Sequence, residues 1–314
     1  MKKFLNVLKI ILLAILIILI LVEGVILIYN KVMESKEEVY WQNPPGQMVE
    51  VDGHKMHIYS EGKGEQTIVF MSGWGDTSPY QQFLPLCKAL NKDFRVVIIE
   101  KFGYGLSDTV DGNRDVETVL ENDREALSAA GIDGPFILCP HSLSGLEATL
   151  WAQNYPEEVK GIVGIDTSVK ENKYLEETEL EKQQRKIMDR YRFFRAAGLL
   201  RVLDNLEANI LTEDDKMENA IVYRSLLNKT QMSEDANINS DCDVIASKPL
   251  PSVPTVQYVS KQTIEMYPLW GKAHKALVDA SVDGQYIEVD ASHYIYKEKP
   301  ELIIDGIREF ANKL

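Results

Sequence analysis

The stretch PHSLSGLEA, residues 140–148, decides how the rest of the chain is interpreted. It follows the short apolar run PFILC and opens the helical pattern LEATLWAQNY. A serine at such a strand-to-helix junction is either a nucleophile on a sharp turn or an ordinary helix cap. The usual nucleophile pattern is Gly-x-Ser-x-Gly, whereas Pro140 and Ser144 occupy the two glycine positions around Ser142. The surrounding sequence therefore has to decide between the two roles.

Strand and helix signals alternate on both sides of this stretch. Helical patterns separate four short apolar runs, which are TIVFM, RVVIIE, PFILC and GIVGID. Continuous apolar strands between helices indicate a parallel sheet covered on both faces. Upstream, two alternating runs flank Asp52-Gly53, which predicts a β-hairpin. Downstream, PTVQYV and QYIEVD predict two further strands, each followed by a helix.

A charged helical segment, residues 168–249, interrupts this alternation. It contains KYLEETELEKQQRKIMDRYRFFRAAGLL, RVLDNLEANIL and DDKMENAIVYRSLLN. We interpret it as a helical cap inserted into one α/β domain. Residues 47–167 and 250–314 then form the first and second parts of the core.

The N-terminus differs in kind from the rest. Its apolar residues continue from Ile10 to Ile28, and such a helix is roughly 28 Å long, close to the thickness of a bilayer's hydrocarbon core. No small-residue cleavage site follows, so we expect an uncleaved membrane anchor in residues 1–30 and a polar linker in residues 31–46. Lysines crowd the N-terminal flank, which predicts a cytoplasmic N-terminus and an extracytoplasmic globular part.

Composition narrows the classes of partner. The chain has 314 residues, of which 45% are hydrophobic, enough for a large buried core. A net charge of -14 argues against nucleic acid, because phosphate contacts need clustered Lys and Arg. Cys87, Cys139 and Cys242 are far apart and show no metal-ligand spacing. We expect no metal or cofactor, and as partners a small-molecule substrate and, through the N-terminal helix, the membrane.

Four motifs in order make residues 47–314 resemble the α/β-hydrolase fold family. MSGWG resembles the oxyanion loop after the third strand, with Ser72-Gly73 in place of the usual His-Gly. FGYGLSD resembles the Gly-x-Gly-x-Ser turn after the fourth strand, and PHSLSG the nucleophile elbow. DASHYIYKEKPELI resembles the loop that carries the catalytic histidine. The resemblance is strongest to capped members such as proline iminopeptidases, esterases and carbon–carbon bond hydrolases. It implies an α/β fold with a mostly parallel sheet, helices on both faces and a helical cap, here behind an N-terminal transmembrane helix.

The resemblance implies that Ser142 is a nucleophile, which needs a base because its hydroxyl is weakly nucleophilic at neutral pH. His293 follows the strand QYIEVD at the carboxyl edge of the sheet, where catalytic loops gather, so we expect it to be the base. The other histidines are expected to play no such part: His54, His57 and His274 at the surface, and His141 beside the nucleophile but out of reach of its oxygen.

Three carboxylates are candidates for the acid that orients His293. In the family it usually follows the seventh strand, where this chain has Thr263, with Glu265 nearby. In some members it ends the sixth strand, where Asp166 lies in GIVGIDTS, although many members have a structural aspartate there. We rank Asp166 first, Glu265 second and Glu100 third.

Two backbone N–H groups complete the site that the resemblance implies. The family places them on the residue after the nucleophile and in the loop after the third strand, here Leu143 and Trp74. The expected function is a membrane-anchored serine hydrolase that cleaves an ester or amide of a small or lipid-like substrate through an acyl-enzyme. Epoxide hydrolases and haloalkane dehalogenases of this fold use an aspartate nucleophile, and Ser142 argues against both. The alternative is a catalytically inactive domain of this fold, tethered to the membrane as a binding or sensor module.

Overall fold

The computed structural model forms two compact units. The parts of the chain that it describes are residues 2–171, 179–204 and 212–314. The smaller unit comprises residues 1–43 and 178–226, and the larger unit residues 44–177 and 227–314. The segment that we expected to be a cap is thus shared between the units, because its last helix, α8 (Lys229–Ala246), lies in the larger one.

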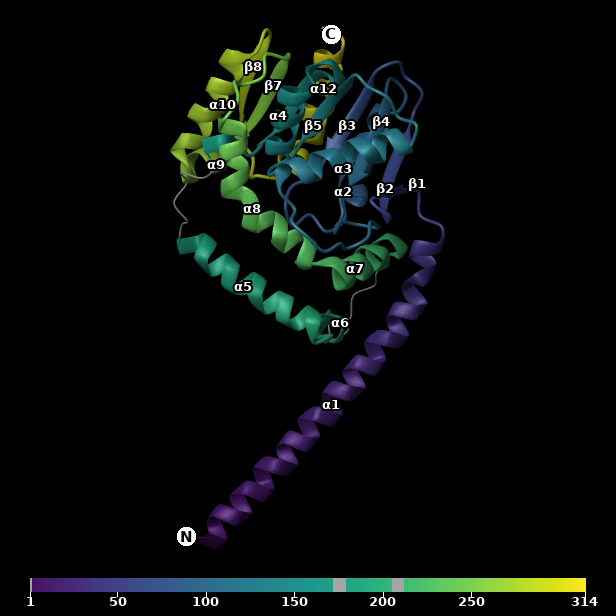
Figure 1. The fold of residues 1–314 in the computed structure, drawn as a ribbon, viewed down its shortest axis with the longest axis vertical. Coiled ribbons are helices and arrows are strands. Elements are labelled where there is room, and N and C mark those ends of the chain that lie inside the picture. Colours follow the sequence, from purple (N-terminus) through teal and green to yellow (C-terminus); the bar gives the residue numbers. More distant parts are fainter. Residues whose placement is uncertain (1, 172–178, 205–211) are drawn as a thin grey trace. The chain divides into compact units, whose positions relative to one another are not determined.

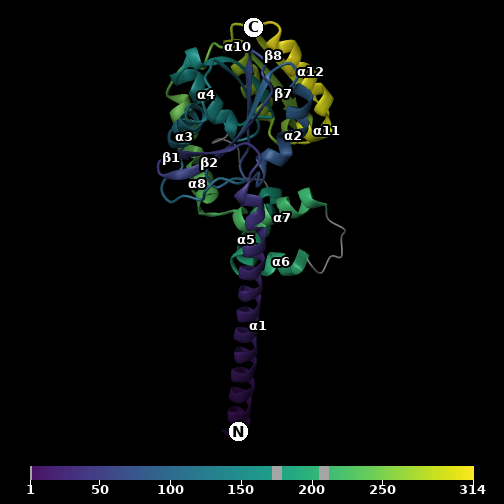
Figure 2. The same ribbon diagram turned by 90° about the vertical axis from the view of Figure 1, so that its right-hand side faces the viewer.

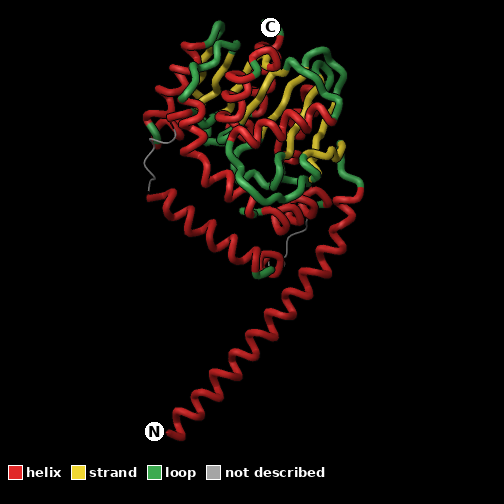
Figure 3. Tube along the Cα trace, in the orientation of Figure 1, coloured by secondary structure: helices red, strands yellow, loops and turns green. Residues whose placement is uncertain are grey.

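The larger unit is built on an eight-stranded sheet, shown as a yellow layer between helices in Figure 3. The strands are β1 (Gln47–Val51), β2 (His54–Glu61), β3 (Thr67–Met71), β4 (Arg95–Glu100), β5 (Phe136–Pro140), β6 (Val159–Ile165), β7 (Thr255–Ser260) and β8 (Gly284–Val289). Their order is β1-β2-β4-β3-β5-β6-β7-β8. β2 is antiparallel to β1 and to β4, and every other neighbouring pair is parallel. The structure therefore confirms the predicted mostly parallel sheet.

Helices cover both faces of this sheet (Figure 1). They are α2 (Pro79–Leu90), α3 (Val116–Ala129), α4 (Ser144–Asn154), α8, α9 (Lys261–Met266), α10 (Pro268–Ala280), α11 (Ile295–Glu298) and α12 (Pro300–Ala311), and a short 3-10 turn, η1 (Pro156–Glu158), follows α4. Ile68 and Phe70 of β3 belong to an apolar cluster with α2, α11 and α12. Val69 and Met71 belong to the opposite cluster, with α3, α4 and α8. This alternation along one strand explains why the buried strands are continuously apolar.

The smaller unit contains the long N-terminal helix. Its helices are α1 (Lys2–Gln42), α5 (Glu179–Ala196), α6 (Leu199–Asp204) and α7 (Glu213–Ser225). α1, the single long helix in Figure 2, has a stretch of mean hydropathy 3.4 and is long and apolar enough to cross a membrane. It also continues through most of residues 31–46, which we expected to be a linker.

Candidate active site

Ser142 lies on a sharp turn between β5 and α4. Its φ is +54°, in the left-handed region that residues other than glycine rarely adopt. The backbone carbonyl of Ser142 accepts hydrogen bonds from the N–H groups of Ser168, at 2.7 Å, and Gly145, at 3.0 Å. A Cβ built on Gly73 would lie only 2.6 Å from the Cβ of Ser142, so the loop after β3 approaches the turn closely. The turn thus has the geometry of a nucleophile elbow.

The two departures from the glycine pattern fit this turn. Pro140 is the last residue of β5, where a missing N–H removes little from the sheet. Oγ of Ser144 lies 2.8 Å from the carbonyl oxygens of both Met71 and His141 and accepts a hydrogen bond from the His141 N–H at 3.0 Å. Its single proton bonds one carbonyl at a time. Ser144 therefore connects the ends of β3 and β5, which glycine cannot do.

The structure brings together Ser142, His293 and Asp166. Nε2 of His293 lies 2.8 Å from Oγ of Ser142, and Nδ1 lies 2.7 Å from Oδ2 of Asp166. The His293 side chain is 33% exposed, whereas Asp166 is fully buried. A hydroxyl, an imidazole and a carboxylate thus form one hydrogen-bonded chain whose outer end is accessible to a substrate.

Asp166 is held by three further donors. Its carboxylate accepts hydrogen bonds from the Ser260 N–H at 2.9 Å, the Thr263 hydroxyl at 2.6 Å and the Trp270 indole at 2.9 Å. Burial alone would raise the pKa of Asp166, but the hydrogen bond and charge of His293, with the Thr263 and Ser260 donors, lower it below its usual value. Asp166 is therefore an ionised acceptor. Sequence reasoning missed these three partners, although it had identified Thr263 as the family's usual acid position.

The other two carboxylates lie elsewhere. Glu265 is exposed on α9. Glu100 is buried and bonds Nδ1 of His57 at 2.9 Å and the Leu106 N–H at 2.8 Å. In the described part of the chain, the ring nitrogens of His293 bond Ser142 and Asp166, so neither alternative acid reaches them.

Two expectations about histidines were wrong. His57 and His274 are fully buried, not at the surface. Glu100 and the Pro45 carbonyl bond the ring of His57. The ring of His274 bonds the Trp270 carbonyl at 2.8 Å and the Thr167 hydroxyl at 3.1 Å. Each imidazole can be buried because both of its nitrogens have hydrogen-bond partners.

His141, expected to be out of reach of the nucleophile, lies under the His293 loop. Its ring centroid is 4.8 Å from that of His293, and Nε2 is 3.2 Å from the His293 carbonyl oxygen. Nδ1 is 3.4 Å from the Asp76 carboxylate. Burial lowers the pKa of His141, so its ring is neutral at pH 7 and can donate to that carbonyl without placing a charge beside His293.

The two expected oxyanion donors come from the turn itself, at Leu143, and from the loop after β3, at Trp74. Among the described residues, the backbone N–H groups of Trp74 and Leu143 donate to no other group. The Trp74 indole donates to the Gln231 carbonyl of α8 at 2.7 Å, and the Gly73 N–H donates to Asp76 at 3.1 Å. The loop after β3 is thereby fixed while the Trp74 amide remains available.

A buried ionic cluster lies behind the elbow helix α4. Nζ of Lys101 is 2.6 Å from carboxylate oxygens of both Glu147, on α4, and Glu234, on α8. The Tyr104 hydroxyl also bonds Glu234. Close by, burial raises the pKa of Asp241 to about 7, although its carboxylate accepts the Val116 N–H at 3.0 Å. The cluster ties α4 to α8 and to the loop after β4.

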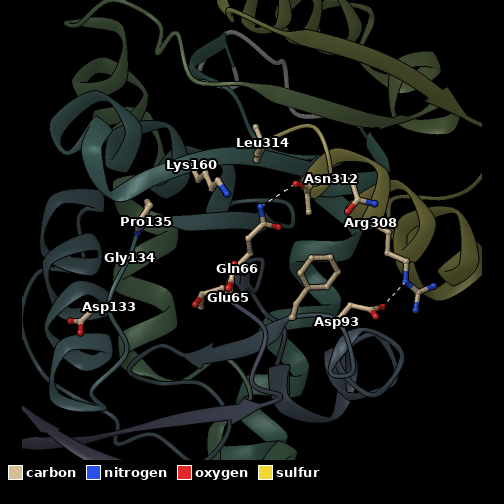
Figure 4. A pocket seen from close by; sticks show the side chains of 13 residues that line it. Glu65, Gln66, Asp93, Asp133, Gly134, Pro135, Lys160, Arg308, Asn312 and Leu314 are labelled. Carbon is tan, nitrogen blue, oxygen red and sulfur yellow. Dashed lines mark hydrogen bonds and ion pairs between the residues drawn. The ribbon is translucent and has the colours of Figure 1, made fainter.

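A cavity of about 940 Å³ lies at the opposite edge of the sheet, and Figure 4 shows the side chains that line it. Gln66 precedes β3 and donates to the Ala311 carbonyl at 3.1 Å, while Asp93 precedes β4 and pairs with Arg308 at 3.2 Å. Ser142 follows the carboxyl end of β5 instead. The cavity therefore belongs to the amino ends of the parallel strands and not to the candidate site.

No metal site emerges in the described part of the chain, where no three His, Cys, Asp or Glu side chains are grouped as ligands. Cys87, Cys139 and Cys242 are buried free thiols. Acyl transfer by a Ser–His–Asp arrangement uses side chains and backbone amides alone.

The chain belongs to the alpha/beta hydrolase fold family, whose family model matches residues 66–245. The protein YbdG of Bacillus subtilis, described as uncharacterized, is 40% identical over 166 residues, 53% of this chain and 51% of the relative. A pimeloyl-[acyl-carrier protein] methyl ester esterase of Shewanella woodyi is 35% identical over 115 residues, 36% of this chain and 40% of the relative. The matches thus span about half or less of these relatives.

Solved structures share the fold at low sequence identity. A mutant epoxide hydrolase from Bacillus megaterium is 19% identical with a TM-score of 0.64, over 85% of this chain and 100% of that one. An enol-lactonase from Burkholderia xenovorans is 19% identical with a TM-score of 0.55 over the same shares. The family match establishes the α/β-hydrolase fold for this chain.

Proposed function

We propose that the protein is a serine hydrolase that cleaves a carboxylic ester or amide through an acyl-enzyme. The observation that carries the proposal is the Ser142–His293–Asp166 chain, with distances of 2.8 and 2.7 Å. Ser142 Oγ attacks the substrate carbonyl while Nε2 of His293 takes its proton and then passes it to the leaving group. Water, activated by the same nitrogen, hydrolyses the acyl-enzyme. Asp166 fixes the imidazole tautomer and stabilises the imidazolium.

The tetrahedral intermediates need donors for the oxyanion. The backbone N–H groups of Trp74 and Leu143 supply them, and one such donor contributes about 3 kcal/mol in related enzymes. Main-chain donors tolerate changes of side chain, so Ser72 in place of the family's histidine leaves this part of the mechanism intact.

An ester of a small or lipid-like acyl group is the substrate class that we favour. The Shewanella relative is named for the cleavage of a methyl ester, and a serine hydroxyl suits acyl transfer. We further propose that α1 anchors the chain, with a cytoplasmic N-terminus and an extracytoplasmic hydrolase unit. Its length, its hydropathy and the lysines before it support this arrangement, and a signal sequence is the competing interpretation.

Labelling with a fluorophosphonate probe, followed by mapping of the modified residue, tests the catalytic proposal. We expect modification of Ser142 in the full chain and none in Ser142→Ala, with Ser128→Ala, at an exposed position of α3, as the control that keeps labelling. A folded protein that reacts at no serine and hydrolyses no ester would instead be an inactive binding or sensor module. Protease protection in intact cells and the N-terminus of the mature protein test the anchor separately.

A further inference from the structure

Helix α5 has a charge opposite to that of the chain. Its sequence, ELEKQQRKIMDRYRFFRA, contains six Lys or Arg and three Asp or Glu, and only one of the acidic residues follows residue 181, whereas the chain has a net charge of -14. A basic amphipathic helix in an otherwise acidic protein is typical of a segment that binds an anionic surface.

One side of α5 combines basic and apolar side chains. Lys186, Arg190 and Phe193 have i, i+4 and i+7 spacing, so they share a face of the helix, and all three are exposed. Phe193 is 64% exposed, and beside this face Ile187 and Tyr191 are 44% and 48% exposed. Helices that bind at a bilayer surface combine Lys and Arg with exposed aromatic and aliphatic residues in this way.

Within the smaller unit, α5 ends beside the point where α1 leaves its apolar segment. Gly198, which follows α5, accepts a hydrogen bond from the side chain of Asn30 at 2.8 Å. Asn30 lies two residues after Ile28, the end of the apolar run. Arg201 bonds Asn30 at 3.0 Å and also pairs with Glu37. In Figure 1, α5 runs across the direction of α1 and not along it, as a helix parallel to a membrane surface would.

A cavity lies beside this contact, and residues of α1, α5, α6 and α7 line it. It has a volume of about 420 Å³, and charged side chains line it: Lys31, Glu34, Arg195 and Arg201. Nη1 of Arg195 donates to the Arg224 carbonyl at 3.1 Å, but its Nε is buried without a partner among the described residues. Guanidinium groups bind phosphate well, because they offer several fixed donors.

We propose that α5 is an interfacial helix that lies on the anionic phospholipid surface of the membrane holding α1, with a headgroup phosphate bound at Arg195. The inference rests on the proposed membrane anchoring by α1. Each Lys or Arg near an anionic surface strengthens binding by about fivefold, and Phe193, Ile187 and Tyr191 add burial at the acyl boundary.

Spin labels on the full chain in vesicles test the proposal. A label at Phe193→Cys reports on α5, one at Leu19→Cys on α1, and one at Val282→Cys, an exposed position of the larger unit, is the aqueous control. Vesicles of phosphatidylcholine alone are compared with vesicles that also contain phosphatidylglycerol. Collision rates with oxygen and with a water-soluble nickel complex give the depth of each label.

We expect the label at residue 193 to be shielded from nickel at headgroup depth with phosphatidylglycerol, while residue 282 stays in water. Lys186→Glu together with Arg190→Glu should lower the ratio of immersed to water-exposed label by at least about tenfold. A lipid-embedded label at residue 19 with a water-exposed label at residue 193 would overturn the inference and leave the anchor intact. Water exposure at both positions would overturn both. A label at residue 193 that is equally immersed in the two kinds of vesicle would contradict the electrostatic basis.

Discussion

Thr263 and His293 both bond Oδ2 of Asp166, at 2.6 and 2.7 Å, although Thr263 occupies the position where the family usually has its acid. The carboxylate comes from the end of β6, and Thr263, in the helix α9 that follows β7, donates a hydrogen bond to it. Two alternative positions for the acid thus meet at one place in space, which explains how a chain with threonine at the family's usual acid position can still hold a carboxylate against His293.

Replacement of the acid should separate its proposed role from that of Glu265. We expect Asp166→Asn to keep the fold but to lower kcat by roughly 10⁴-fold, as in the serine-protease triad, because the amide favours the wrong imidazole tautomer. Glu265→Gln, at an exposed position, should change kcat little. Steady-state hydrolysis of a chromogenic ester measures both. A large loss of kcat in Glu265→Gln with a small loss in Asp166→Asn would identify Glu265 as the acid. Full activity in both variants would remove Asp166 from the mechanism.

Ser144 should be more important for stability than the glycine of the family pattern suggests. Ser144→Ala removes the donor to the buried carbonyls of Met71 and His141, so we expect a loss of about 1–3 kcal/mol in the free energy of unfolding. Ser128→Ala, at an exposed position of α3, is the matched control. Urea unfolding in detergent, followed by tryptophan fluorescence, compares the variants. Equal stability would mean that the hydrogen bonds of Ser144 contribute nothing.

Breaking the buried ionic cluster around Lys101 should lower the stability of the protein. Lys101→Met leaves Glu147 and Glu234 buried and facing each other, and loss of one partner from a buried ion pair typically costs about 3–5 kcal/mol. Lys88→Met is the control, because Lys88 pairs with Glu61 at the surface and that pair should matter little. Thermal unfolding of the two variants provides the comparison. Similar melting temperatures would show that the buried carboxylates do not need Lys101.

Asp241 should make the protein less stable as the pH rises. Its pKa is about 7 in the folded protein and about 3.9 in the unfolded chain, so the folded state binds more protons between these values. The free energy of unfolding therefore falls from about pH 4 to pH 7 and stays lower above that range.

Asp241→Asn should flatten this dependence and raise stability at pH 8 by at least about 1 kcal/mol, since the amide oxygen still accepts the Val116 N–H. Urea unfolding at pH 5 and pH 8 measures the change. Asp243→Asn, at an exposed position of the same helix, should leave the slope as it is. A slope that persists in Asp241→Asn would assign the pH dependence to other groups.

Much of the fold was predictable because buried parallel strands are continuously apolar. TIVFM and RVVIIE correspond to β3 and β4, and the Asp52-Gly53 turn joins β1 to β2. Motif order along the chain was enough to predict where Ser142 and His293 would lie. α8 was harder to assign, because it belongs to the larger unit through contacts such as that of Gln231 with the Gly103 carbonyl, at 2.9 Å.

The sequence did not predict hydrogen bonds between residues that lie far apart in the chain. Trp270 bonds Asp166 across 104 residues, and no local pattern marks it as part of the site. His57 was expected at the surface because it lies in a hairpin, yet it is buried because Glu100, 43 residues later, bonds its ring. Hydrogen bonds that allow a polar side chain to be buried depend on the folded topology, which periodicity does not encode.

The position of Asp166 at the end of β6 also determines how the proposed machinery is divided along the chain. Ser142, Asp166 and the Trp74 and Leu143 amides all precede residue 178, and His293 alone follows residue 226. A single protease nick between these limits would make two fragments, one with the nucleophile, acid and oxyanion donors and the other with the base. Neither fragment could turn over an ester by itself. Esterase activity of the nicked protein would therefore measure noncovalent association of the fragments, and mixing separated fragments would restore it by complementation.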